Sequence, residues 1–134
     1  MERTYVMLKP DAYERRLIGE IISRIERKNF KITDIKMLNL NKAMLAKHYA
    51  HLVNKPFYSA LEKFMMSGPV VAMIVEGENV VQGIRNLMGA TKWLEAIQGT
   101  IRGDYANNTT ENLIHGSDSI ENAEIEIERF FGSK

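Results

Sequence analysis

The sequence contains no cysteine, so disulfide bonds, thiolate nucleophiles and thiolate metal sites are excluded. Proline is scarce, with three residues. No apolar run approaches the roughly 20 residues that cross a bilayer. Neither sign of charge dominates, because 18 basic residues stand against 17 acidic ones. Attraction to nucleic acid or to a membrane surface is therefore not expected, and we expect a cytoplasmic protein.

The amino-acid composition is typical of a globular protein. The chain has 134 residues, of which 45% are hydrophobic and 26% are charged. No linker, repeat or low-complexity segment divides it, so we predict a single domain over residues 1–134. With a net charge of only +1, any anionic ligand has to be held by a local cluster of cationic side chains.

Strand-like and helix-like segments alternate along the chain. Apolar runs rich in β-branched and aromatic residues predict strands at 4–8, 32–40, 70–75 and 113–114. Apolar residues at helical spacing predict helices from 17, from Asn41 to about 51, at 58–66, after Asn79 and at 120–131, with Asn41 and Asn79 as N-cap residues. Residues 89–111 show no sustained period and are expected to form a long loop, which in a compact domain is usually functional or disordered. Four strands interleaved with helices indicate an α/β or α+β fold, and periodicity alone does not decide whether the sheet is parallel.

A histidine motif near the carboxyl terminus is the strongest chemical signal. The run Asn112-Leu113-Ile114-His115-Gly116-Ser117-Asp118 places an imidazole beside a hydroxyl and a carboxylate, on backbone that we expect to be irregular. Histidine can act as a base, a metal ligand or a nucleophile at neutral pH. From these residues alone, a buried structural histidine is the competing interpretation.

Phosphate binding by backbone amides is not indicated, because the sequence has no glycine-rich phosphate-binding loop. Lys9, Arg85 and Arg102 are the candidate phosphate ligands, since guanidinium and ammonium groups suit phosphate oxygens. Each of them, taken singly, can equally be a solvated surface charge.

The histidine motif resembles the active-site signature of the nucleoside diphosphate kinases, which reads Asn-x-x-His-Gly-Ser-Asp. The resemblance extends over nearly the whole chain, through Lys9-Pro10-Asp11, Leu17-Ile18-Gly19, His48-Tyr49, Lys55-Pro56-Phe57-Tyr58, Gly89-Ala90-Thr91 and Gly99-Thr100-Ile101-Arg102. It implies an α+β fold with a ferredoxin-like core, in which helices cover a four-stranded antiparallel sheet. It also implies transfer of the γ-phosphate of a nucleoside triphosphate, mainly ATP, to a nucleoside diphosphate by a ping-pong route through a phosphohistidine.

The same resemblance implies a role for each matching residue. His115 is the expected nucleophile, Glu126 orients its imidazole directly or through Ser117, and Tyr49 lines the same pocket. The nucleotide-binding residues implied are Lys9, Arg85 and Arg102 for the phosphates, Thr91 for a phosphate oxygen, Asn112 and Lys9 for the ribose, and Phe57 for the base. Mg²⁺ is expected to arrive bridging the phosphates, with Asp118 reaching it at most through water.

Two departures from the family pattern concern loops. Where the family has prolines, this chain has Lys92-Trp93 and Ile97-Gln98, and Thr109 replaces an apolar residue beside the base. The family forms hexamers or tetramers, and Trp93, Leu94 and Ile97 are large apolar residues in the loop that contacts neighbours in hexamers. We therefore expect a homohexamer with these three residues buried at a subunit interface; a homotetramer is the alternative.

Other functions remain as alternatives. A nucleic-acid-binding module is disfavoured by the balanced charge, and a catalytically weak scaffold is disfavoured by the presence of His115, Lys9, Arg102 and Asn112 together. His48 and His51 lie three residues apart without a third ligand nearby, so no metal pair is expected. His48 matches a pocket-edge position of the family, and His51 is expected at the surface.

Overall fold

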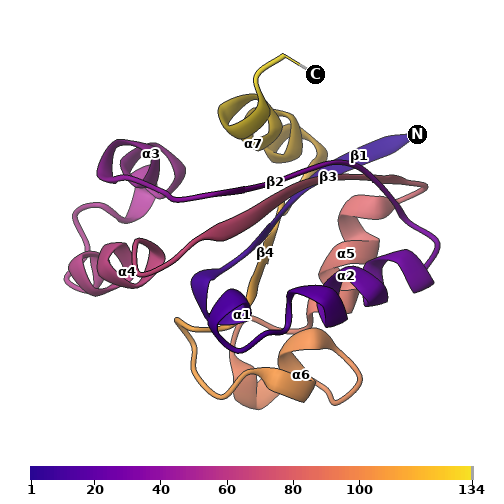
Figure 1. Cartoon of the computed structure of the whole chain (residues 1–134), viewed down its shortest axis with the longest axis horizontal. Helices are drawn as coiled ribbons and strands as arrows, with labels where there is room; N and C mark the ends of the chain where they lie inside the picture. The colour runs from indigo at the N-terminus through magenta and orange to yellow at the C-terminus, as the bar shows by residue number, and fades with distance from the viewer. Residues whose placement is uncertain (134) are drawn as a thin grey trace.

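The computed structural model describes residues 1–133, and within them four strands form one sheet (Figure 1). The strands are β1 (Glu2–Leu8), β2 (Lys31–Leu38), β3 (Val70–Gly77) and β4 (Ile114–Gly116), in the order β2-β3-β1-β4. All three pairings are antiparallel; β1 pairs with β3 through Tyr5↔Ile74 and with β4 through Met7↔His115. The prediction of a four-stranded antiparallel sheet with helices is therefore confirmed.

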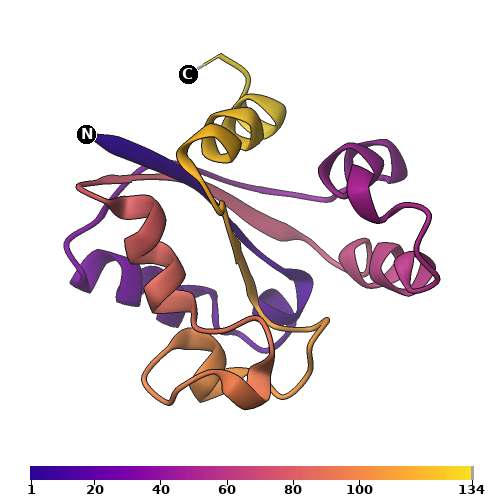
Figure 2. The same ribbon diagram turned by 180° about the vertical axis from the view of Figure 1, so that it is seen from behind.

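Helices cover both faces of the sheet (Figures 1 and 2). One face packs against α3 (Lys42–His48), α4 (Tyr58–Met65) and α7 (Ile120–Phe131), and the other against α2 (Ile18–Arg27), α5 (Val80–Met88) and α6 (Ile101–Tyr105). A short helix α1 (Pro10–Glu14) and two 3₁₀ turns, η1 (Ala50–Leu52) and η2 (Trp93–Glu95), complete the described elements.

Two hydrophobic cores follow from this layering. In β1, Tyr5 and Met7 join the core under α7, while Val6 and Leu8 join the core over α2 and α5. In β3, residues 70–75 are all buried, because both faces of this central strand are covered. A strand buried on both faces needs an apolar side chain at every position, which explains the unbroken run Val70–Val75.

Most predicted elements are found close to their expected bounds. The helix at 120–131 agrees with α7, and Asn41 caps α3 as predicted, since its side chain accepts a hydrogen bond from the Met44 N–H at 2.9 Å. That helix ends at His48 rather than near residue 51. Asn79 is the N-cap residue of α5 as predicted, although with a φ of 53° its side chain makes no capping hydrogen bond.

Two local predictions are wrong because the elements are too short to show a period. Residues 89–111 contain η2 and α6, which Thr100 caps by accepting from the Gly103 N–H. Helix α1, which the sequence did not indicate, follows β1 directly, with Pro10 in its first turn, where the missing N–H leaves no bond unmade. His115 lies within β4, not on irregular backbone.

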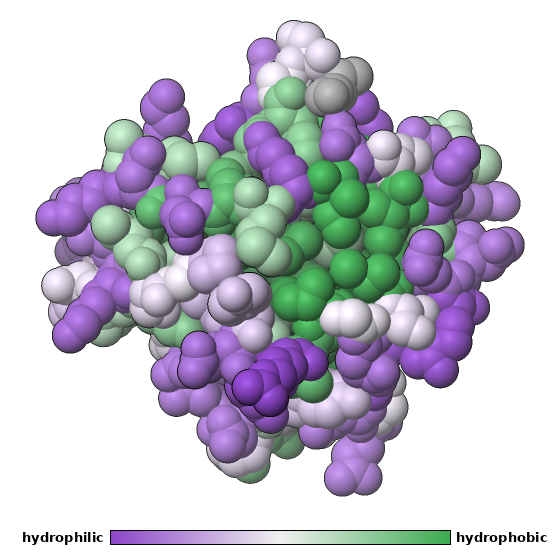
Figure 3. Space-filling model, viewed as in Figure 1, coloured by the Kyte–Doolittle hydropathy of each residue, from purple (hydrophilic) through white to green (hydrophobic). Residues whose placement is uncertain are grey.

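Strand β2 forms one edge of the sheet and faces the viewer in Figure 1. Hydrophobic side chains gather along this region of the surface in Figure 3, and Ile35 and Met37 of β2 are about half exposed. An open edge with apolar side chains is a surface that proteins normally cover by pairing or packing. Among the helices of residues 1–133, none has the length and apolar character needed to cross a membrane.

Candidate active site

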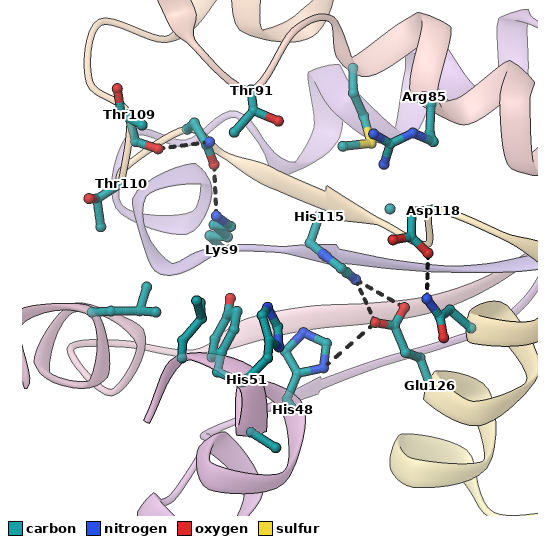
Figure 4. Close-up of a pocket in the computed structure, with 18 of the residues that line it drawn as sticks. Lys9, His48, His51, Arg85, Thr91, Thr109, Thr110, His115, Asp118 and Glu126 are labelled. Atoms are coloured by element: carbon teal, nitrogen blue, oxygen red, sulfur yellow. Dashed lines mark hydrogen bonds and ion pairs between the residues drawn. The ribbon is translucent and has the colours of Figure 1, made fainter. Parts of the chain in front are cut away.

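The predicted site residues meet around one cavity of about 680 Å³ (Figure 4). Segments from both ends of the chain line it, because β1 and β4 are neighbours in the sheet. The predicted residues that line the cavity are Lys9, Tyr49, Phe57, Arg85, Thr91, Arg102, Asn112, His115, Asp118 and Glu126. Ser117 is buried behind them, where it contacts Glu126.

His115 is held by a carboxylate on one edge of its ring. Its Nε2 lies 3.0 Å and 3.1 Å from the two carboxylate oxygens of Glu126, and Ser117 Oγ donates to Glu126 Oε1 at 2.6 Å. Glu126 therefore bonds to the imidazole directly and to the Ser117 hydroxyl as well. Burial by itself raises the pKa of Glu126, but the hydrogen bonds from His115 and Ser117 outweigh it and the pKa is lowered.

An ionised carboxylate only accepts hydrogen bonds, so the proton of the neutral imidazole sits on Nε2. Within residues 1–133 no hydrogen bond occupies Nδ1, which keeps its lone pair. Gly116 follows His115 because β4 packs closely on α5: a Cβ at this position would lie 2.7 Å from Met88 Sδ. The arrangement is that of a positioned nitrogen nucleophile.

Three cationic side chains, those of Lys9, Arg85 and Arg102, line the cavity. Lys9, at the end of β1, is 8% exposed, and burial together with the nearby Arg102 lowers its pKa to about 8. Burial and the charge of Arg85 lower the pKa of Arg102 to about 10. Cations that lower one another's pKa in a cavity are the electrostatic sign of a site for an anion.

Arg102 has a structural role that the sequence did not indicate. Its guanidinium donates to the carbonyl oxygens of Gly89 at 3.2 Å, Asn112 at 3.3 Å and Ile114 at 2.6 Å. Gly89 has a φ of 84°, and a Cβ there would lie 2.4 Å from Thr100 Oγ1, so only glycine fits this close approach. Arg102 thus ties the end of α5 to the strand that carries His115.

Helix α6, which carries Arg102, is fixed by a polar network on the other side. Arg24 of α2 forms ion pairs with Asp104 at 2.7 Å and with Glu20 at 2.9 Å, and the Tyr105 hydroxyl donates to Glu20 at 3.2 Å. Asp104 also accepts from the Gly99 N–H at 2.8 Å. These bonds stabilise a helix of only five residues, which is too short to be stable by itself.

The two residues expected at the ribose are in contact with each other. Lys9 Nζ donates to Asn112 Oδ1 at 2.7 Å, and Asn112 Nδ2 donates to the Thr109 carbonyl at 2.9 Å. Phe57, which is half exposed, and Thr109 both line the cavity. These are the two positions that the family resemblance places beside the base. Thr91 is exposed and lines the same cavity (Figure 4).

Two candidate metal positions exist among the described residues. Asp118 lines the cavity with a carboxylate that accepts from Asn122 Nδ2 at 2.5 Å, and Mg²⁺ commonly takes one carboxylate plus substrate phosphates. Separately, His48, His115 and Glu126 bring potential ligand atoms within 4.8 Å of one another. Arg129 places a cation against His48 in that second group, which opposes a metal ion there.

The structure brings three further residues to the site: His48, which the resemblance placed at the pocket edge, His51, and Arg129, which the sequence reasoning missed. His48 is 6% exposed, its ring meets that of His115 edge to face with centroids 4.9 Å apart, and Arg129 Nη1 lies 3.1 Å from its Nδ1. His51, expected simply at the surface, is exposed but lines the cavity. Arg129 follows Glu126 by three residues on one helix, so helical spacing could have placed both on the same face.

Comparisons with known proteins agree with the fold and the motif. A family model described as nucleoside diphosphate kinase matches residues 2–134. A nucleoside diphosphate kinase of Exiguobacterium sibiricum is 54% identical over 131 residues, which are 98% of this chain and 95% of that protein.

Solved structures of the same description superpose closely. The apo structure of a nucleoside diphosphate kinase from Encephalitozoon cuniculi has a TM-score of 0.96 at 47% identity, covering 99% of this chain and 90% of that one. A halophilic nucleoside diphosphate kinase from Halobacterium salinarum, in complex with CDP, has a TM-score of 0.95 at 46% identity, covering 98% of this chain and 88% of that one.

The burial of His48 predicts a stability that depends on pH. Burial and the neighbouring His115 lower the pKa of His48 to about 3, whereas the ordinary pKa of a histidine side chain is 6.5. Below about pH 6.5, His48 therefore becomes protonated in the unfolded chain but stays neutral in the folded protein. The free energy of unfolding consequently decreases as the pH falls. Between pH 7 and pH 5 the loss from this residue should be about 2 kcal/mol.

Denaturant unfolding at both pH values checks this expectation. The His48→Gln variant, which keeps an acceptor for Arg129, should lose less stability than the unmodified protein by that amount. His51→Gln, which removes an exposed histidine, is the control and should leave the pH dependence unchanged. Equal pH dependence in the unmodified protein and in His48→Gln would contradict the assignment.

Proposed function

The chain belongs to the nucleoside diphosphate kinase family, whose members are phosphotransferases, and we propose that His115 carries the transferred phosphoryl group. The activity is that of the family: the γ-phosphoryl group of a nucleoside triphosphate passes to a nucleoside diphosphate by a ping-pong route. The observation that carries the assignment of His115 is its hydrogen bonding, with Nε2 bound to Glu126 and Nδ1 left as the nucleophilic nitrogen.

In the first half-reaction, the Nδ1 lone pair attacks the γ-phosphorus of the triphosphate. A P–N bond forms as the bond from the γ-phosphorus to the β–γ bridging oxygen breaks, and the nucleoside diphosphate leaves with that electron pair. The imidazole becomes positively charged, and Glu126 stabilises that charge through the Nε2–H bond. The second half-reaction reverses these steps with another diphosphate as the attacking group.

The cationic side chains are proposed to bind the phosphates. Lys9 and Arg85 face the cavity, and Arg102 has N–H groups beyond those that bind carbonyl oxygens. The lowered pKa values of Lys9 and Arg102 support this proposal, because a phosphate would restore the favourable charged state of both. The Thr91 hydroxyl is proposed to donate to a phosphate oxygen, and Tyr49 to form the adjacent wall.

Phe57 is proposed to stack on the base, while Lys9 and Asn112 hold the ribose hydroxyls. The preferred triphosphate is proposed to be ATP, although stacking itself is blind to the base. Mg²⁺ is proposed as the cofactor, arriving with the nucleotide phosphates, and Asp118, whose carboxylate lines the cavity, would reach it at most through water. When bound it neutralises phosphate charge.

We propose that the protein assembles as a homohexamer, with a homotetramer as the alternative. Leu94 and Ile97 are 79% and 77% exposed in the single chain, and Trp93 beside them is partly buried. The apolar edge of β2 gives a second surface that a neighbouring copy can cover. Two separate apolar surfaces suit a particle built from more than one kind of contact.

The covalent proposal predicts the behaviour of His115→Ala. Incubation with γ-labelled ATP should give the unmodified protein an acid-labile phosphate that maps to the peptide containing His115. The variant should take up no label and should lose nucleotide exchange, while its circular dichroism stays native. Label on His48 or His51, or exchange at an undiminished rate in the variant, would sink the proposal.

The stacking proposal predicts that Phe57→Ala weakens purine and pyrimidine nucleotides alike. Stacking on an aromatic ring is worth about 1–3 kcal/mol per base, so each Kd should rise roughly tenfold. Tyr13→Ala, which removes an exposed aromatic residue outside the cavity lining, is the control and should bind nucleotides normally. Loss of binding for a single base would contradict recognition by stacking alone.

The assembly proposal predicts the effect of Leu94→Asp. The side chain is exposed within one chain, so the fold should persist, but an unpaired charge at a subunit interface should split the particle into smaller species. Light scattering should give the mass of six copies for the unmodified protein and a lower mass for the variant. Ile120→Asp, at an exposed position on α7, is the control. A monomer or dimer of unmodified protein at micromolar concentration would refute the hexamer.

A further inference from the structure

The backbone just before His115 adopts a rare turn at Leu113. Leu113 is fully buried and has a φ of 77°, in a region that branched side chains seldom occupy. The Ile114 N–H donates to the Asn112 carbonyl at 2.9 Å, which closes a three-residue γ-turn around Leu113. A γ-turn with a positive φ is strained, and it persists only where the surroundings hold it.

Residues at the end of β1 and the start of α1 stabilise the turn by hydrogen bonds to Leu113. Asp11 Oδ2 accepts from the Leu113 N–H at 3.1 Å, and the Lys9 N–H donates to the Leu113 carbonyl at 2.9 Å. Both polar groups of the strained residue are thus paired with one segment of the chain. Asp11 is only 6% exposed, so removing its acceptor would leave a buried N–H without a partner.

The turn sets the relative placement of two side chains in the cavity. Asn112 precedes it and accepts from Lys9 Nζ, while His115 follows it in β4 and faces Glu126. A relaxed backbone at Leu113 would rotate Asn112 and His115 with respect to each other. The geometry between the proposed ribose ligand and the proposed nucleophile therefore depends on this turn.

We propose that Asp11 is a positioning residue for phosphoryl transfer, because its carboxylate oxygen holds Leu113 in the strained turn and so fixes His115 and Asn112 relative to each other. The inference rests on the proposed role of His115 as nucleophile. Asp11 itself is not among the residues that line the cavity.

The property required of Asp11 is an acceptor oxygen rather than a negative charge. Its second oxygen, Oδ1, is buried without a hydrogen-bond partner among residues 1–133. Burial raises the pKa of Asp11, although Lys9 nearby acts in the opposite direction, so the surroundings do not favour the charged form. An asparagine at this position can accept the same hydrogen bond with its carbonyl oxygen, because its amide group occupies nearly the same space as the carboxylate.

Three variants separate these properties. Asp11→Asn keeps an acceptor, Asp11→Leu keeps the approximate shape without one, and Glu14→Gln changes an exposed acidic residue on the same helix as a control. The rate constant for labelling of the protein by γ-labelled ATP is measured in a single turnover at saturating nucleotide. The Kd for ADP and the thermal unfolding of each variant are measured in parallel.

Asp11→Leu should label about 10- to 100-fold more slowly while remaining folded, because displacement of a reacting group by about 1 Å has effects of this size. Its Kd for ADP should change less than the rate, since the turn adjoins Asn112 but Phe57 and Arg85, two other proposed nucleotide ligands, lie on other segments. Asp11→Asn should label at close to the unmodified rate, and Glu14→Gln at the unmodified rate. A residue that only stabilises the fold would lower the unfolding temperature without this split between rate and binding.

A folded Asp11→Leu protein that labels within about threefold of the unmodified rate, well short of the loss expected from a displaced reacting group, would overturn the inference. An Asp11→Asn protein as slow as Asp11→Leu would overturn it too, by showing that charge is what matters. If Asp11→Leu does not fold, amide hydrogen exchange of Leu113 in the unmodified protein decides: strong protection is expected, and rapid exchange overturns the proposal. Absence of label on His115 in the unmodified protein would instead reject the proposed function.

Discussion

The partly buried carboxylate of Glu126 is the constraint on which the arrangement of the site depends. A buried charge needs hydrogen-bond partners, and Glu126 finds them in His115 and Ser117, which lie in β4 and directly after it. These bonds fix α7 against the short strand β4 and at the same time fix the proton on Nε2. Structural stability and the preparation of the proposed nucleophile therefore depend on the same bonds.

Charges of both signs meet around His115. The Glu126 carboxylate lies at Nε2, whereas Lys9, Arg85 and Arg102 line the cavity proposed to receive the phosphates. A reaction that moves negative charge from a phosphate toward a leaving group and leaves positive charge on the imidazole is stabilised at both ends by this arrangement. Arg102 also binds three carbonyl oxygens, so its replacement affects backbone geometry as well as charge.

The sequence alone was sufficient for the long, periodic elements and for the motif. The apolar run of β3, the amphipathic α7 and the Asn41 cap all depend on local patterns, which a sequence displays directly. The roles of Glu126 and Phe57 came from family resemblance. Contacts between distant residues left no such local pattern: His48 and Arg129 are 81 positions apart, and the side chains around Leu113 reveal nothing of its positive φ. Helix α6 was missed because its stability comes from Arg24 in another helix rather than from its own five residues.

The pairing of the first strand with the last has a consequence for biosynthesis. Lys9 and Asn112 are separated by 103 positions in the chain, and Glu126 follows later still, yet all three contribute to one cavity. Contacts between such distant segments form late in folding, because the entropy of closing a long loop opposes them. On the ribosome, β1 is made before β4 and must wait for the long segment between Lys9 and Asn112 before that partner appears. Strand β1 thus lacks its β4 neighbour while α2 to α6 are synthesised, and the cavity is complete only after α7 has followed.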